Sequence, residues 1–166
     1  MPVRYYKYDK PFVLENGERL PELQIAYHTY GKFKGNNAIW VCHALTANSD
    51  VADWWPRTVE QGRFLDPRRY YVVCANVIGS HYGSTGPLSL NPATGKPYYG
   101  SFPFITVRDM VNAHLLLADH LGVGSVRAVI GSSIGGFQAL EMALARPGFA
   151  ERLALIATCL LYTSDA

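Results

Sequence analysis

Two adjacent serines in the stretch GSSIGG, Ser132 and Ser133, are the residues whose type and spacing first indicate chemistry. The register G-x-S-x-G fits Ser133, with Gly131 and Gly135 on either side of it. This spacing is typical of a nucleophile elbow, a sharp turn that exposes a serine hydroxyl and leaves no room for bulky residues two positions away. The pattern therefore predicts that Ser133, and not Ser132, acts as a nucleophile.

The segments around Ser133 are those that an elbow requires. A strand-forming run, RAVI, precedes the motif, and a helix-forming run, GGFQALEMALARP, follows it. Such a turn leaves the serine at the N-terminus of the helix, where backbone amides and the helix dipole favour developing negative charge. The amide of Ile134 is therefore expected to donate to an oxyanion formed at this serine.

A second oxyanion donor is expected from a different strand. The apolar run NAIWVC is followed by HALT, residues 43–46. Enzymes with an elbow of this kind take their other oxyanion amide from the loop after such a strand, which makes the Leu45 amide the candidate. His43 precedes the nucleophile, whereas a triad histidine follows it. We therefore predict that His43 fixes this loop by hydrogen bonds rather than acting as the base.

The same glycine-rich stretch has simpler interpretations. It could be a turn between strand and helix without a catalytic role, or one that cradles a phosphate group. A dinucleotide-binding turn fits poorly, because GSSIGG does not match G-x-G-x-x-G and the chain does not open with it. The position of the motif after a buried strand favours the elbow.

Strand and helix signals alternate along the chain. Asn16-Gly17 predicts a β-hairpin turn near the N-terminus. Buried strands are predicted at AIWVC, YYVVC, VRAVI and RLALI. Helices are predicted over 107–121, with Thr106 as its N-cap, and over 136–145. This order predicts an α/β fold with a mostly parallel sheet and an N-terminal β-hairpin.

Two connecting segments differ in kind. Residues 46–66 have a mixed pattern that predicts partial helix. Residues 81–105 are dense in Gly, Pro, Ser and Asn, which predicts a long ordered loop. A loop of this length within a compact domain is usually functional.

The composition is that of an ordinary globular protein and excludes several functions. Of 166 residues, 49% are hydrophobic and 17% are charged, with a formal net charge of +2. Basic residues are scattered, which does not favour nucleic acid or a membrane surface as partner. No apolar run has the length of a signal-peptide core or a membrane span, so we expect a cytoplasmic protein. The three cysteines predict neither a disulfide framework nor a metal site.

Three motifs, in the same order, resemble those of homoserine O-acetyltransferase, an acyltransferase family with the α/β-hydrolase fold. They are HALTANSDVADWW, NVIGSHYGSTGPLSLNPATGKPYYGSFPFITVRDMV and GSSIGGFQALEMA, and the resemblance extends to about Thr158. It implies the N-terminal portion of an α/β-hydrolase fold. It also implies that Ser133 is the nucleophile and that the Leu45 and Ile134 amides form the oxyanion hole.

The activity that this resemblance implies is a two-step acetyl transfer in methionine biosynthesis. The serine takes the acetyl group from acetyl-CoA and passes it to the hydroxyl of L-homoserine. No cofactor is implied, since acetyl-CoA is a substrate, and full-length members of the family are expected to be homodimers. Arg108 is expected to pair with a neighbouring carboxylate rather than to bind substrate.

The chain differs from this family in its C-terminal part. Members continue with further strands, a helical lid, and a triad Asp and His, whereas this sequence ends with CLLYTSDA, which does not resemble them. We expect a truncated α/β-hydrolase domain over residues 1–158 and a tail of doubtful origin over 159–166. All five histidines precede Ser133, so the base and its carboxylate are expected to be absent and the chain inactive alone.

Two other functions fit the same residues. A serine esterase or thioesterase of this fold would use the same nucleophile with water as the acceptor. A non-catalytic fragment could use the same half-domain as a binding surface. The sequence leaves these alternatives open, and it leaves open whether the donor carries an acetyl or a succinyl group.

Overall fold

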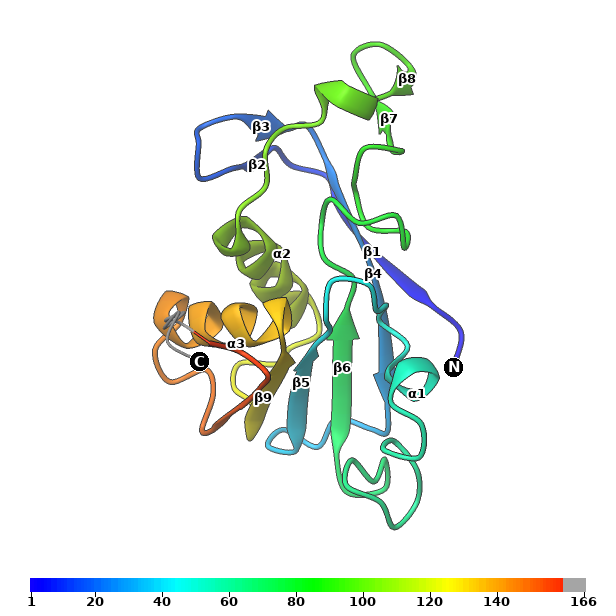
Figure 1. Ribbon diagram of the computed structural model, residues 1–166, viewed down its shortest axis with the longest axis vertical. Coiled ribbons are helices and arrows are strands. Elements are labelled where there is room, and N and C mark those ends of the chain that lie inside the picture. Colours follow the sequence, from blue (N-terminus) through cyan, green and yellow to red (C-terminus); the bar gives the residue numbers. More distant parts are fainter. Residues whose placement is uncertain (160–166) are drawn as a thin grey trace, which may run out of the picture.

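A computed structural model describes residues 1–159 of the chain (Figure 1). Its centre is a six-stranded sheet in the order β1-β4-β6-β5-β9-β10. The strands are β1 (Arg4–Tyr8), β4 (Leu23–Tyr30), β5 (Ala38–Cys42), β6 (Tyr71–Ala75), β9 (Ala128–Ser132) and β10 (Leu153–Ile156). The last four strands are mutually parallel, and β4 and β1 extend the sheet as an antiparallel pair.

The four predicted parallel strands are confirmed, with ends that differ from the predictions by up to two residues. β9, the strand that leads to Ser133, lies inside the sheet between β5 and β10. Every residue of β5 and β6 is buried, because both faces of the central sheet are covered. This double burial is why these strands appear in the sequence as continuous apolar runs.

The predicted hairpin forms, but it is separate from the main sheet. β2 (Phe12–Val13) pairs with β3 (Arg19–Leu20), and the turn between them contains Gly17 at a φ of 86°. The edge strand on this side of the main sheet is β1, which pairs antiparallel with β4. The sequence analysis did not predict this strand. Most of the β1 side chains are exposed, so this edge strand lacks the apolar alternation by which a strand is recognised.

Two helices cover one face of the sheet, α2 (Val107–His120) and α3 (Ile134–Ala145), as Figure 1 shows. α2 begins at the predicted cap: the Asp109 amide donates to Thr106 Oγ1 (3.2 Å), and the Thr106 amide donates to Asp109 Oδ2 (3.0 Å). α3 begins two residues earlier than predicted, directly after Ser133. Within residues 1–159, no helix has the length and apolarity needed to cross a bilayer.

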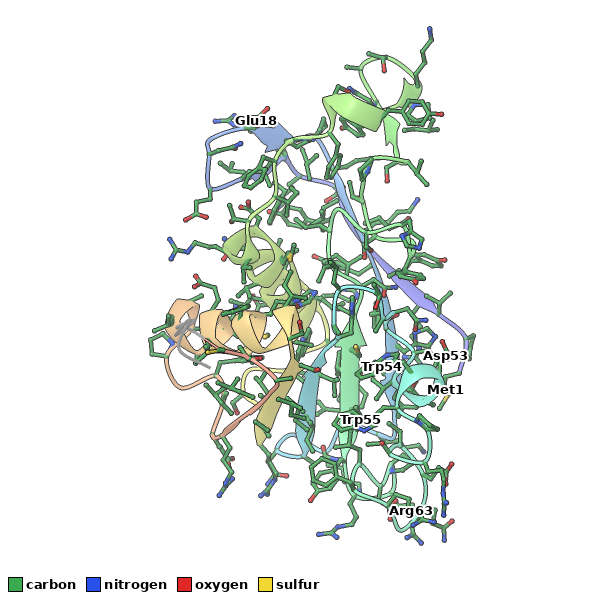
Figure 2. All side chains as sticks on the ribbon, viewed as in Figure 1. Met1, Glu18, Asp53, Trp54, Trp55 and Arg63 are labelled. Atoms are coloured by element: carbon green, nitrogen blue, oxygen red, sulfur yellow. The ribbon has the colours of Figure 1, made fainter. Side chains whose placement is uncertain are left out.

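The opposite face is covered by irregular chain and by α1 (Val51–Trp54). The predicted partial helix over 46–66 is thus confirmed only as a single helical turn. Trp54 and Trp55, labelled in Figure 2, stack with ring centroids 5.7 Å apart and pack against this second core. The buried residues of this core include Val51, Leu65, Val72 and Ile130.

The long loop over 81–105 is ordered, as predicted. It contains the short strands β7 (Leu90–Asn91) and β8 (Lys96–Pro97) and a 3₁₀ turn, η1 (Tyr99–Ser101). Its first part is tied to β4: the Ala26 amide donates to Ser84 Oγ (3.0 Å), and the Gln24 amide donates to Thr85 Oγ1 (2.7 Å). These bonds fix the loop near the ends of the strands that lead to the candidate site.

Candidate active site

Ser133 has the strained backbone conformation that an elbow requires. Its φ is 54° and its ψ is −119°, a region that residues other than glycine rarely occupy, and its side chain is exposed. The Ser133 amide donates to the Ile156 carbonyl (3.0 Å), and the Ser133 carbonyl accepts from the Gly136 amide and from Thr158 Oγ1, both at 3.0 Å. The end of β10 therefore holds the strained residue from both sides.

The glycines of the motif are required by close backbone contacts. A Cβ on Gly131 would overlap the Gly135 carbonyl, and a Cβ on Gly135 would overlap the carbonyl of Cys42 at the end of β5. A Cβ on Gly136 would overlap the side chain of Thr158. Residues 131–136 thus pack closely against the end of β5 on one side and against Thr158, just after β10, on the other, which explains why glycine occupies positions 131, 135 and 136.

The loop that carries Leu45 emerges beside the elbow. Cys42 of β5 pairs with Gly131 of β9, so the two parallel strands end at the same edge of the sheet. His43 follows directly, is 1% exposed, and donates from Nδ1 to the Ala44 carbonyl (2.7 Å). Burial lowers the pKa of His43, which keeps the imidazole neutral. The predicted loop-fixing contact of His43 is therefore present.

Hydrogen bonds at Ala44 determine where the Leu45 amide points. The Ala44 carbonyl accepts from His43 and also from the Ala47 amide (3.0 Å). There is no cis peptide bond in residues 1–159, so the Leu45 N–H points away from that carbonyl in the same peptide plane. Ile134 is the first helical residue of α3, and its amide has no acceptor within the helix. Both amides are available as donors, and their oxyanion role stays a prediction.

A general base for Ser133 is not assigned among the described residues. Within residues 1–159, the Ser133 hydroxyl forms no hydrogen bond. His28 bonds through Nδ1 to Ser49 Oγ (2.8 Å) and through Nε2 to the Met1 carbonyl (3.1 Å). His114 is fully buried in α2, and burial, together with the nearby His43, lowers its pKa to about 3.

Arg108 makes the contacts expected of it. Its Nε donates to Glu141 Oε1 (2.7 Å) in α3, and its Nη1 donates to Glu15 Oε1 (3.0 Å) in the β2–β3 hairpin. The arginine therefore links α2 to two other elements, at the outer side of the helices. The prediction of carboxylate pairing is confirmed.

Two residues at the candidate site were missed by the sequence analysis. Tyr82, in the long loop, donates from its hydroxyl to the Thr46 carbonyl (3.2 Å) in the Leu45 loop. Thr158 contacts the elbow from the end of β10, as described above. Both contacts join residues that are at least 25 positions apart, so no local pattern could indicate them.

Comparison with known proteins agrees with this architecture. The family model of the alpha/beta hydrolase fold matches residues 37–165, which is most of the chain. The chain belongs to the α/β-hydrolase fold family. Its α/β-hydrolase core therefore begins just before β5, and the antiparallel strands β1 and β4 precede the matched part.

Within this fold family, the chain is similar to named enzymes. It is 50% identical to a homoserine O-acetyltransferase from Moorella thermoacetica, over 94% of this chain and 45% of that protein. The crystal structure of a homoserine O-acetyltransferase from Bacillus anthracis superimposes with a TM-score of 0.85 at 30% identity, over 95% of this chain and 47% of that one. Esterase E22 has the same values. The chain thus spans somewhat less than half the length of these relatives.

Proposed function

We propose that the protein is a homoserine O-acetyltransferase and that Ser133 is its nucleophile. The observation that carries this proposal is the positive φ of Ser133 at the end of β9, within a turn where neighbouring backbone excludes any side chain at Gly131 and Gly135. Backbone strain of this size persists where a side chain must be presented in a particular direction. The similarity to the Moorella thermoacetica enzyme supports the choice of substrates, acetyl-CoA and L-homoserine.

The proposed reaction has two acyl-transfer steps. In the first, Ser133 Oγ attacks the thioester carbon of acetyl-CoA, the carbon–sulfur bond breaks, and CoA leaves as a thiol with the proton of the serine. In the second, the hydroxyl of L-homoserine attacks the acetyl-serine, the bond to Oγ breaks, and Ser133 regains a proton. The Leu45 and Ile134 amides donate to the oxyanion in both steps.

The proton transfers of this scheme need a general base. We place it, with its orienting carboxylate, in the part of the protein that corresponds to the remaining length of the relatives. The 166-residue chain on its own is then inactive. We also propose that the full-length protein acts in methionine biosynthesis, that it is cytoplasmic, and that it forms a homodimer.

A serine esterase is the second candidate. Esterase E22 has the same TM-score and identity to this chain as the Bacillus anthracis homoserine O-acetyltransferase. The fold alone therefore does not separate a transferase from a hydrolase. Both functions would pass through an acyl-serine at Ser133, from which L-homoserine would accept the acetyl group in the transferase and water would accept it in a hydrolase.

A full-length chimera tests the proposal. Residues 1–158 of this chain replace the matching N-terminal part of the Moorella thermoacetica enzyme, and the release of free thiol from acetyl-CoA is followed with and without homoserine. We expect homoserine-dependent release that Ser133→Ala lowers by several orders of magnitude, while Ser132→Ala leaves it nearly unchanged. Equal release without homoserine would favour a hydrolase, for which water is the acceptor, and activity that survives Ser133→Ala would refute the nucleophile.

A further inference from the structure

The turn that carries Leu45 is held by hydrogen bonds rather than by packing. The Ala47 amide donates to the Ala44 carbonyl (3.0 Å), which closes a β-turn with Leu45 and Thr46 at its corners. The Leu45 side chain is 67% exposed, so no core contact fixes it. The direction of the Leu45 amide therefore depends on the bonds made by the carbonyls of the turn.

These bonds form one continuous chain through two peptide units. The Tyr82 hydroxyl donates to the Thr46 carbonyl (3.2 Å), and the amide of the same peptide unit, Ala47 N–H, donates to the Ala44 carbonyl. The Ala44 carbonyl and the Leu45 amide belong to the second peptide unit, Ala44–Leu45. The carbonyl and the amide of a planar trans peptide point in opposite directions, so fixing one of them fixes the other. The bond to the Thr46 carbonyl therefore orients the Ala47 amide, and the bond from the Ala47 amide to the Ala44 carbonyl orients the Leu45 N–H.

Tyr82 itself is anchored to the sheet. Asn76, which directly follows β6, donates from Nδ2 to the Tyr82 carbonyl (2.7 Å), and the Asn76 carbonyl accepts from Ser84 Oγ (2.7 Å). Ser84 Oγ in turn accepts from the amide of Ala26 in β4 (3.0 Å). The phenol therefore projects from a fixed segment and can hold the turn in place.

We propose that Tyr82 is a positioning residue for the oxyanion hole: its hydroxyl orients the Leu45 amide through the Thr46–Ala47 and Ala44–Leu45 peptide units. Hydrogen bonds arranged in series also polarise one another, which makes the last amide of the chain a stronger donor. Tyr82 performs no chemistry in this scheme. The proposal rests on the proposed oxyanion role of Leu45.

The matched test compares Tyr82→Phe with Tyr99→Phe in the full-length chimera. Both variants lose one phenolic hydroxyl from the same long loop, and Tyr99 is 63% exposed and lies outside the chain of bonds described above. Hydrogen exchange measures the opening of the Ala47 amide, and kinetics measures kcat and KM. An inhibitor that mimics the tetrahedral intermediate, a trifluoromethyl ketone analogue of acetyl-CoA, reports on the oxyanion hole directly.

We expect Tyr82→Phe to speed exchange at Ala47, to lower kcat roughly 3- to 10-fold with KM unchanged, and to weaken inhibitor binding by the same factor. Tyr99→Phe is expected to change none of these. Faster exchange with unchanged kcat and inhibitor affinity would overturn the positioning role, as would unchanged exchange. If the chimera is inactive, or stays active with Ser133→Ala, the proposed function fails instead, and the exchange result still decides whether Tyr82 holds the turn.

Discussion

The elbow at residues 131–136 and the turn at residues 44–47 lie at the same edge of the sheet, but different forces hold them. The elbow is fixed by backbone contacts so close that no Cβ fits at Gly131 or Gly135. The turn is fixed by hydrogen bonds from the side chains of His43 and Tyr82. Steric contacts of the first kind tolerate no change, whereas hydrogen bonds of the second kind can be removed one at a time.

Gly135→Ala is expected to have the largest effect. The added Cβ would overlap the Cys42 carbonyl and crowd the His43 carbonyl, and these backbone atoms cannot move without disturbing β5. We expect the free energy of unfolding to fall by about 2–4 kcal/mol, measured by urea denaturation. Gly124→Ala is the control, because open space surrounds that position. Equal denaturation midpoints for the two variants would show that sterics do not hold the elbow.

His43→Leu is expected to have an intermediate effect, because it removes the buried donor to the Ala44 carbonyl and leaves the elbow intact. In the full-length chimera, kcat should fall roughly 10- to 100-fold with little change in KM. His43→Asn should retain most of the activity, since its side-chain amide can donate from nearly the position of Nδ1. If the asparagine variant is no better than leucine, hydrogen bonding at Ala44 is not what His43 contributes.

The smallest expected effect is a change in how stability depends on pH, and it comes from the buried His114. Its pKa is lowered to about 3, chiefly by burial, so below the usual value of 6.5 the unfolded state binds a proton that the folded state does not. Stability should therefore fall as the pH decreases from about 6.5 toward 3. Thermal melts at pH 7 and pH 5 should show a smaller loss of stability for His114→Leu than for the unchanged chain, whereas Gly124→Ala, which removes no titratable group, should match the unchanged chain. Equal losses in all three would exclude His114 as the group responsible.

The same contrast explains what could be predicted from the sequence. The elbow was predictable because its constraint is local: glycines at fixed spacing between a strand and a helix. The turn was only half predictable, since HALT at the end of a strand indicated Leu45 and His43. Tyr82 lies 36 residues from Thr46, and only the tertiary structure joins them.

Elements outside the site follow the same rule. The parallel strands were predictable because burial on both faces makes them continuous apolar runs. β1 was missed because, as a largely exposed edge strand, it carries no such pattern. The predicted change of origin at residues 159–166 lies, except for Cys159, outside the described residues and stays a prediction.

The order in which the strands pair allows the sheet to fold while the chain is still being synthesised on the ribosome. β6 pairs with β4 and β5, β9 with β5, and β10 with β9, so each of these later strands finds partners that have already been synthesised. Translation can therefore extend the sheet strand by strand, in the N- to C-terminal direction in which nascent domains fold. The bonds that hold Ser133 come from Ile156 and Thr158. We expect these two bonds to Ser133 to form only after β10 and Thr158 have left the exit tunnel, whereas the close contacts of Gly131 and Gly135 involve segments that are synthesised earlier.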